Sequence, residues 1–307
     1  MEMAPAKRAT IDPRTIPPPA SPHGSAPLAL PPSLQLNRLA QALLCGQLVA
    51  DTSATDYRPT ESIIYECDNH PYAGLMGLAE NLEAINARIA AACERAQRAP
   101  ASVTLMAVTK THPPETVQAA ADLGITFLGE NKVQEAKAKI PQCSGKLRWH
   151  FIGHLQSNKA RDAVELFEMI QSVDSLALAQ ELNKRCEQAG KRMPILLEVN
   201  LAAEASKFGY NPERVLAELK DLNALPRLEI HGLMTVPPFK PVAEQVRPYF
   251  QHAAELKRRC EDLLGAPLPQ LSMGMSGDFE VAIEEGATIV RIGTALFGER
   301  AKKSAAM

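Results

Sequence analysis

The feature that most constrains the fold of this chain is an alternation of short apolar runs with amphipathic segments between residues 104 and 292. The apolar runs predict eight strands: Thr104–Val108, Thr126–Leu128, Trp149–Ile152, Ile170–Val173, Ile195–Val199, Leu228–Met234, Leu271–Met273 and Thr288–Ile292. The helices predicted between them include Pro114–Leu123, Ser175–Ala189, Pro212–Asn223 and Val242–Leu264. Such alternation indicates parallel strands joined by crossover helices, in either a closed barrel or an open doubly wound sheet.

The number of units favours the closed form. Eight strand–helix units in about 200 residues fit a barrel better than an open sheet, which usually has fewer strands. No GxGxxG motif follows an early strand, and this weighs against a dinucleotide-binding fold. The sequence therefore predicts an α/β protein built on a (β/α)8 TIM barrel.

The first 75 residues differ from the rest in composition. Prolines crowd the opening stretch, at positions 13, 17, 18, 19, 22, 27, 31 and 32. Proline removes backbone donors and breaks helices, so we expect 1–75 to be a disordered Pro/Ala-rich extension, with one short amphipathic helix at Leu34–Val49. From Met76 onward, apolar residues recur at helical spacing. We expect the barrel to span 76–303, followed by a tail at 304–307; Met76 is an alternative start of the protein.

Composition narrows the class of partner and the compartment. A net charge of −2 gives no reason to expect nucleic acid, and no apolar run approaches the length needed to cross a bilayer. The first residues lack the pattern of a secretion signal. The six cysteines form no CxxC pair, so neither a zinc site nor a redox dithiol is indicated. We expect a cytoplasmic protein without a metal site.

The residues that follow the strands carry the chemical signal, because the carboxyl ends of barrel strands share one face. Lys110 lies two residues beyond the first predicted strand. Desolvation there would lower its pKa toward nucleophilic use, although a solvated loop lysine is the commoner role of the residue type. Asn131 follows the second strand and His154 the third. We expect His154 to line the site, whereas His150 is interpreted as structural.

The loops after the last two strands predict a phosphate site. Gly274 and Gly293 would permit close backbone approach, and Ser276 and Thr294 offer hydroxyl donors. Barrels often bind phosphate between these two loops. The alternative is a pair of ordinary turns, with Ser276 capping a helix that contains Asp278 and Glu280.

Arg291 lies in the eighth predicted strand. Its head is expected near the mouth of the barrel, where it needs a partner. The alternative to a role in the site is an ion pair with an acid such as Glu130 or Asp278.

Several stretches resemble one family, the YggS/PROSC-type pyridoxal-phosphate homeostasis proteins. They are AVTKT (107–111), LGENKVQE (128–135), WHFIGHLQSNKAR (149–161), VNLAAEASKFGY (199–210), GLMTVPP (232–238) and LSMGMSGDFEVAIEEGATIVRIGTALFGER (271–300). The family is similar to the barrel half of bacterial alanine racemases. The resemblance implies a fold-type III pyridoxal phosphate (PLP) barrel without the C-terminal β domain.

The resemblance also implies roles for individual residues. Lys110 would hold PLP as a Schiff base, and Arg291 would face the pyridine nitrogen. Ser276, Gly293 and Thr294 would contact the phosphate, and Asn131 and His154 complete the candidate cofactor-binding set. Two positions depart from the family's pattern, with Lys132 in place of an aromatic residue and His112 in place of a second lysine.

Two functions follow from the resemblance. The first is a non-catalytic protein that buffers PLP or delivers it to PLP-dependent apoenzymes; the second is an amino-acid racemase. Arginine at the pyridine nitrogen keeps its proton, which makes the ring a weaker electron sink. Racemisation also needs an acid/base on each face of the α-carbon, and we expect no second domain after Met307 to supply one, which would leave a partner subunit or His154. The carrier is therefore the favoured prediction.

Overall fold

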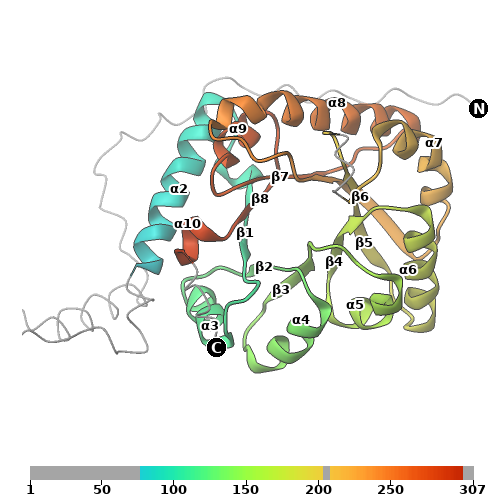
Figure 1. Cartoon of the computed structure of the whole chain (residues 1–307), viewed down its shortest axis with the longest axis horizontal. Helices are drawn as coiled ribbons and strands as arrows, with labels where there is room; N and C mark the ends of the chain where they lie inside the picture. The colour runs from blue at the N-terminus through green and yellow to red at the C-terminus, as the bar shows by residue number, and fades with distance from the viewer. Residues whose placement is uncertain (1–76, 203–207, 300–307) are drawn as a thin grey trace, which may run out of the picture. The chain divides into compact units, whose positions relative to one another are not determined.

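Eight parallel strands close into a barrel in which each strand pairs with the next and β8 pairs with β1 (Figure 1). The structure is a computed structural model that describes residues 77–202 and 208–299. The predicted extension 1–75, its helix Leu34–Val49 and the tail 304–307 lie outside the described residues. The predicted (β/α)8 TIM barrel is confirmed.

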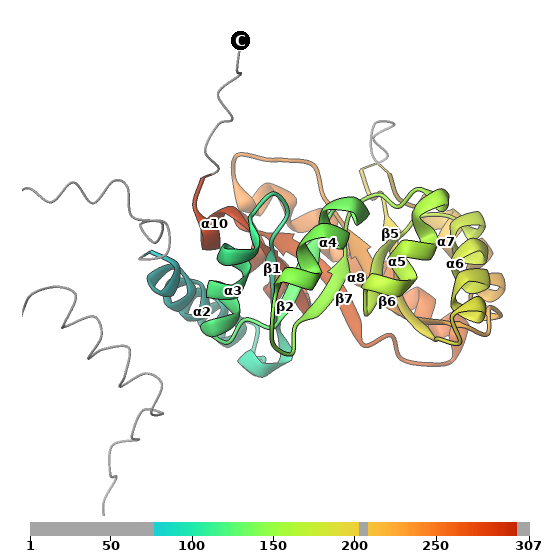
Figure 2. The same ribbon diagram turned by 90° about the horizontal axis from the view of Figure 1, so that it is seen from below.

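The elements alternate along the described chain. The strands are β1 (Thr104–Val108), β2 (Phe127–Glu130), β3 (Arg148–Phe151), β4 (Met169–Val173), β5 (Met193–Val199), β6 (Leu228–Thr235), β7 (Gln270–Met275) and β8 (Ile289–Ile292). The helices are α2 (Leu78–Arg95), α3 (Pro114–Asp122), α4 (Val133–Lys139), α5 (Ala160–Leu166), α6 (Leu176–Gln188), α7 (Pro212–Asn223), α8 (Arg247–Leu264), α9 (Phe279–Glu284) and α10 (Thr294–Phe297). Seen from the side, the helices surround the strands (Figure 2).

Element boundaries agree with the sequence prediction where local signals are strong. Strand β1 and helix α7 match in full, and α7 begins with Asn211 as a side-chain N-cap and Pro212 in its first turn. Strands β2 and β7 run further than predicted, to Glu130 and Met275. Helix α8 begins at Arg247 rather than Val242, because Pro248 fits a first turn but not a helix interior.

Side-chain alternation divides the buried residues between two cores. The large core lies between strands and helices and includes Ile195, Leu197 and Leu233. Met169, Leu196 and Met234 form a separate small cluster on three neighbouring strands. Because successive strand residues point to opposite faces, this second cluster occupies the barrel interior.

Helix α2 precedes the barrel and packs beside α9 and α10 (Figure 1). Arg88 makes a two-point contact with Glu280 of α9, at 2.8 and 2.9 Å. Asn81 donates to the Leu296 carbonyl of α10 at 3.0 Å. Glu280 is thus a partner of α2, which ties the first described helix to the last βα units. No helix within the described ranges has the length and apolar character of a bilayer span.

Candidate functional site

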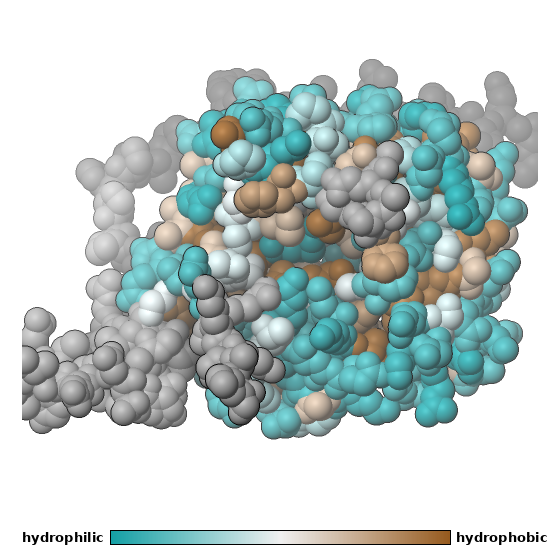
Figure 3. All heavy atoms as spheres, in the orientation of Figure 1, coloured by the Kyte–Doolittle hydropathy of each residue, from teal (hydrophilic) through white to brown (hydrophobic). Residues whose placement is uncertain are grey.

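The carboxyl ends of the strands meet on the face turned to the viewer in Figure 1. Figure 3 shows this face hollowed at its centre, with hydrophilic residues around much of the rim. Active sites of such barrels lie at this end, built from the residues that follow each strand.

Lys110 lies two residues beyond β1 and is half-buried. It lies in the turn that follows the buried Thr109, at the carboxyl end of the strand. Val108 at the end of β1 pairs with Gly129 of β2. The segments that contain Lys110 and Asn131 therefore follow neighbouring strands at the mouth.

The loops after β7 and β8 come together as a pair. The Ala295 N–H donates to Ser276 Oγ at 3.1 Å. The alternative in which Ser276 caps the next helix is wrong, because Asp278 is the N-cap of α9 and Ser276 bonds across to α10 instead. This contact places Ser276 against the turn that contains Gly293 and the exposed Thr294.

The two predicted cradle glycines differ in what requires them. Gly274 has φ +90°, and a Cβ there would lie 2.6 Å from the Ala282 Cβ of α9. Backbone conformation and packing therefore explain Gly274 without a ligand. Gly293 has φ −115°, and a Cβ there would meet the Val108 Cβ at an ordinary 3.5 Å. The protein itself leaves room for a side chain at Gly293, and that space lies beside the strand that leads to Lys110.

Arg291 is buried inside the barrel, where its guanidinium makes two contacts. It donates to Ser272 Oγ and to the Thr235 carbonyl, both at 2.8 Å. Burial lowers its pKa to about 10, against the opposing influence of Glu198 and Asp278. The predicted alternative partner Glu130 is wrong, because Glu130 pairs with Lys139 on the far side of the sheet. At neutral pH Arg291 keeps its charge.

A row of polar side chains continues from Arg291 across the interior. We call Arg291, Ser272, Gln171 and His150 the lumen network. Ser272 donates to Gln171 Oε1 at 2.7 Å, and Gln171 Nε2 lies 3.0 Å from His150 Nδ1. Burial, with a smaller influence from Arg148, lowers the pKa of His150 to about 4. His150 is therefore a neutral interior residue, and the part of the chain that the structure describes holds no group of three or more potential metal ligands.

His154 lies on the rim, on the side of β4 and β5. Its Nδ1 is 3.1 Å from Asp174 Oδ2, and its ring stacks on Phe208 with centroids 3.6 Å apart. Asn131 and His154 both line a pocket of about 180 Å³ between the β2–α4 and β3–α5 connections. His154 therefore stands apart from the turn with Ser276 and Gly293, and Asn131 lies between the two regions.

Two charged residues at this end were not singled out by the sequence. Glu198 on β5 lies on the same face of its strand as Leu196 of the interior cluster. Burial, with the nearby Asp174, raises its pKa to about 7, although Arg291 acts to lower it. Lys139 on α4 is buried against Glu130. A glutamate inside an apolar strand run was the available signal for Glu198; Lys139 looked like one of many helix lysines.

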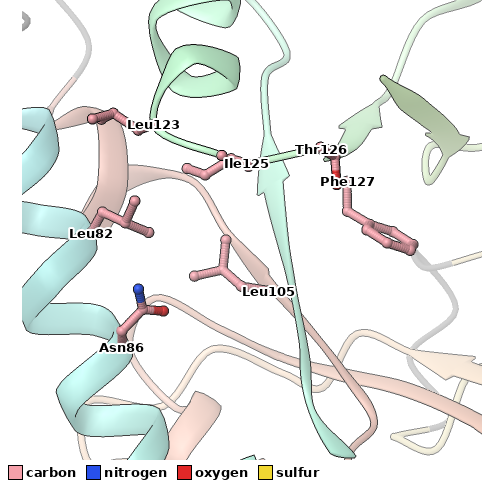
Figure 4. A pocket seen from close by; sticks show the side chains of 8 residues that line it. Leu82, Asn86, Leu105, Leu123, Ile125, Thr126 and Phe127 are labelled. Atoms are coloured by element: carbon pink, nitrogen blue, oxygen red, sulfur yellow. The ribbon is translucent and has the colours of Figure 1, made fainter. Parts of the chain in front are cut away.

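A second pocket, of about 270 Å³, lies at the opposite end of the barrel (Figure 4). Leu82 and Asn86 of α2 and Leu105 near the start of β1 line it, together with the segment that connects α3 to β2. No titratable side chain lines this pocket. It lies at the amino ends of the strands, the end of such barrels that usually serves stability rather than catalysis.

Comparison with known proteins now adds to this geometry. The profile of the family described as alanine racemase, N-terminal domain, matches residues 81–301. Pyridoxal phosphate homeostasis proteins of Aquifex aeolicus and Pseudomonas aeruginosa are 43% and 45% identical to the chain. Each match covers 73% of this chain, and it covers 99% and 96% of the respective relative. The chain belongs to the pyridoxal phosphate homeostasis protein family.

Solved structures agree with this family membership. PipY of Synechococcus elongatus, solved with PLP bound, is 39% identical with a TM-score of 0.64, over 72% of this chain and all of that one. Alanine racemase of Clostridium difficile is 18% identical with a TM-score of 0.56, over 75% of this chain and 58% of that one. The likeness to alanine racemase is one of fold alone, whereas the likeness to PipY extends to the sequence.

Proposed function

We propose that this chain binds PLP at the carboxyl-end face, holds it covalently through Lys110, and buffers or delivers it. The observation that carries the proposal is the space left at Gly293 beside Val108, the last residue of the strand that leads to Lys110, on a barrel of this family. The names of the relatives and the PLP-bound PipY structure support the choice of ligand.

The donor set at the mouth fits PLP. PLP supplies an aldehyde that condenses reversibly with a primary amine and releases one water. Lys110 offers that amine. Ser276 lies against the turn of Gly293 and Thr294, and these residues offer hydroxyl and backbone N–H groups, the donors that a phosphate monoester requires. Arg291 offers a fixed cation below the mouth, and Asn131 an amide beside Lys110.

The carrier role is favoured by how the acid–base groups near the mouth are engaged. Arg291 stays protonated at neutral pH and donates to Ser272 and Thr235. It cannot supply a proton to a ring nitrogen, so the cofactor would be a weaker electron sink. This engagement of Arg291 argues against racemisation, which depends on a stabilised carbanion.

One observation keeps racemisation as the second candidate. Glu198 has a pKa of about 7, which is the range in which a general acid or base works best at neutral pH. It lies within electrostatic reach of Arg291 and Asp174. A carboxyl group of this kind is the residue on which an amino-acid reaction at this site would depend.

The rim of the mouth supports contact with another protein. Large exposed hydrophobic residues lie at the end of β7 and on the segments after β5 and β6: Phe208, Val236, Phe239, Val242 and Met275. Phe239 is 93% exposed. Exposed apolar residues on one side of the mouth suit transfer of PLP to a PLP-dependent apoenzyme, which we propose as the partner. The cytoplasmic location stays a prediction from the sequence.

The decisive experiment is chemical mapping of the cofactor. Protein loaded with PLP should show a visible absorbance band that borohydride removes, and peptide mapping should then place the adduct on Lys110. Lys110→Ala should abolish the band while the circular dichroism spectrum stays unchanged. An adduct on Lys159 or Lys207 instead would overturn the assignment. Incubation with L-alanine in deuterated water tests the second candidate, and we expect only trace exchange at the α-carbon.

A further inference from the structure

A buried ion-pair network lies directly behind Lys110, on the helix side of the sheet. The Lys139 ammonium, 5% exposed, donates to Glu130 at 2.7 Å, to Glu135 at 2.9 Å and to the Thr109 carbonyl at 2.8 Å. These contacts use all three of its N–H donors. We call Lys139, Glu130 and Glu135 the Lys139 clamp.

The clamp holds the backbone of Thr109, the residue that precedes Lys110. The carbonyl of Thr109 accepts from Lys139, and the Thr109 hydroxyl donates to the same Glu130 oxygen at 2.7 Å. The Thr109 N–H donates to the Gly129 carbonyl at 3.1 Å. Donor, acceptor and side chain of Thr109 are all bound, so the residue before Lys110 has little freedom to move.

The clamp also holds the residue that follows Lys110. The Thr111 N–H donates to Glu135, and Thr111 adopts φ +68°. A β-branched residue rarely occupies this left-handed conformation, which persists only where its surroundings enforce it. Glu135 is thus a local reason for the turn at Thr111. One helix, α4, supplies both contacts through residues one turn apart, Glu135 and Lys139.

Burial of the charged groups of the clamp has an unfavourable desolvation free energy, which a purely structural contact would not need. Burial raises the pKa of Glu130 despite its hydrogen bonds from Lys139 and Thr109. For Glu135, burial acts to raise the pKa, but the hydrogen bonds from Lys139 and the Thr111 N–H outweigh it and lower the pKa. Buried ion pairs are weak sources of stability, and apolar residues of similar volume often replace them without loss. Their value here is orientation of the segment that carries Lys110.

We infer that Lys139 and Glu135 are positioning residues that fix the backbone on both sides of Lys110 and thereby aim its amine at the cofactor. The inference rests on the proposed role of Lys110 as the PLP-bearing lysine. Neither residue is expected to touch the cofactor. Both act through Thr109 and Thr111, whose backbone groups they bind.

The test uses Glu135→Ala, Glu135→Gln and Lys139→Met in the full chain, with Lys137→Met as matched control. Lys137 lies on the same helix and pairs with Asp162 at 3.2 Å, but is 58% exposed. Hydrogen–deuterium exchange of the cofactor-free protein reports on the peptide that contains Thr111. A PLP titration followed at the visible band reports on affinity, and thermal unfolding reports on the fold.

We expect Glu135→Ala and Lys139→Met to speed exchange around Thr111 and to raise the PLP dissociation constant about 10-fold or more, because the Lys110 amine would no longer be held in position. Glu135→Gln keeps an acceptor oxygen for the Thr111 N–H and should stay near wild type, as should Lys137→Met. If Lys139→Met fails to fold, the Glu135 pair decides, because Glu135 is partly exposed.

Two results would overturn the inference. The first is unchanged affinity in Glu135→Ala despite faster exchange, since the clamp would then be structural only. The second is unchanged exchange around Thr111 in that variant. A wild-type protein that carries PLP on another lysine would instead refute the proposed function, and the exchange data would still report whether the clamp holds the backbone.

Discussion

The lumen network and the Lys139 clamp are both buried and polar, yet they balance charge differently. Arg291 in the lumen network bonds to a hydroxyl and a carbonyl, both neutral, and the nearby carboxylates act on it only through space. Lys139 in the clamp bonds directly to two carboxylates. The first arrangement leaves a cation whose charge is available to a ligand; the second consumes its charge internally. This difference fits the two proposals made above, in which Arg291 serves PLP binding and the Lys139 clamp sets the geometry of Lys110.

The largest expected effect is on the free energy of unfolding, which should fall further when the Lys139 clamp is broken than when the lumen network is. Lys139→Met should lower the free energy of unfolding by about 3–5 kcal/mol, because Glu130 would remain buried without its cation. Arg291→Met should cost less, about 1–3 kcal/mol, because only the neutral acceptors Ser272 and Thr235 lose a donor. Urea unfolding of the cofactor-free proteins measures both values.

The same two variants should also differ in PLP affinity, because the two side chains act on the proposed site in different ways. Arg291→Met removes a cation of the proposed site, whereas Lys139→Met is expected to act through the backbone of Lys110. Equal losses of unfolding free energy in the two variants would contradict the view that the two networks balance charge differently.

A smaller effect concerns Glu198 and pH. Its pKa of about 7 in the fold compares with an ordinary value of 4.5, so the folded state binds more protons than the unfolded chain between these values. Stability should therefore fall as pH rises through this range, and this contribution should remain lost above pH 7. Relative to Glu198→Gln, which mimics the protonated group, the wild type should lose about 2–3 kcal/mol between pH 5 and pH 8.

The measurement is urea unfolding of both proteins at several pH values. Subtracting the Glu198→Gln curve removes the contribution of the histidines, which both proteins share. A difference that is flat with pH would show that Glu198 ionises normally and has no special place near Arg291.

The smallest expected effect on stability is at Gly293. An alanine Cβ would meet Val108 at 3.5 Å, an ordinary contact. Gly293→Ala should therefore change the free energy of unfolding by less than about 1 kcal/mol. PLP affinity should nevertheless fall, because the added methyl group takes the space proposed for the phosphate. Unchanged affinity would remove Gly293 from the proposed site.

Much of the fold could be predicted because its signals are local. The period of apolar residues in β1 and α7 and the caps at Asn211 and Pro212 are properties of neighbouring residues. Boundaries were less accurate where pairing extends a strand, as in β7, or where a proline shifts a helix start, as at Pro248. The hydrogen-bond ladder with neighbouring strands decides such ends.

Candidate site residues were predicted from a rule that needs no side-chain detail. In a parallel barrel every strand ends on one face, so Lys110, Asn131, Arg291 and Gly293 could be assigned to a common region from their order alone. The partners of these residues could not be predicted in this way. From the sequence, Ser276 could cap the helix that follows β7 and Arg291 could pair with Glu130. The structure contradicts both alternatives.

The amino-acid sequence by itself determined the barrel and the residues at its mouth, because periodicity and strand order are carried by adjacent positions. Only the closed tertiary structure decided that Ser276 bonds to the Ala295 N–H, that Lys139 binds Thr109 and Glu130, and that Glu198 is desolvated near Arg291. Each of these depends on distance and burial between segments far apart in the chain, where a hydrogen bond or a pKa responds to shifts of an ångström that no local pattern encodes.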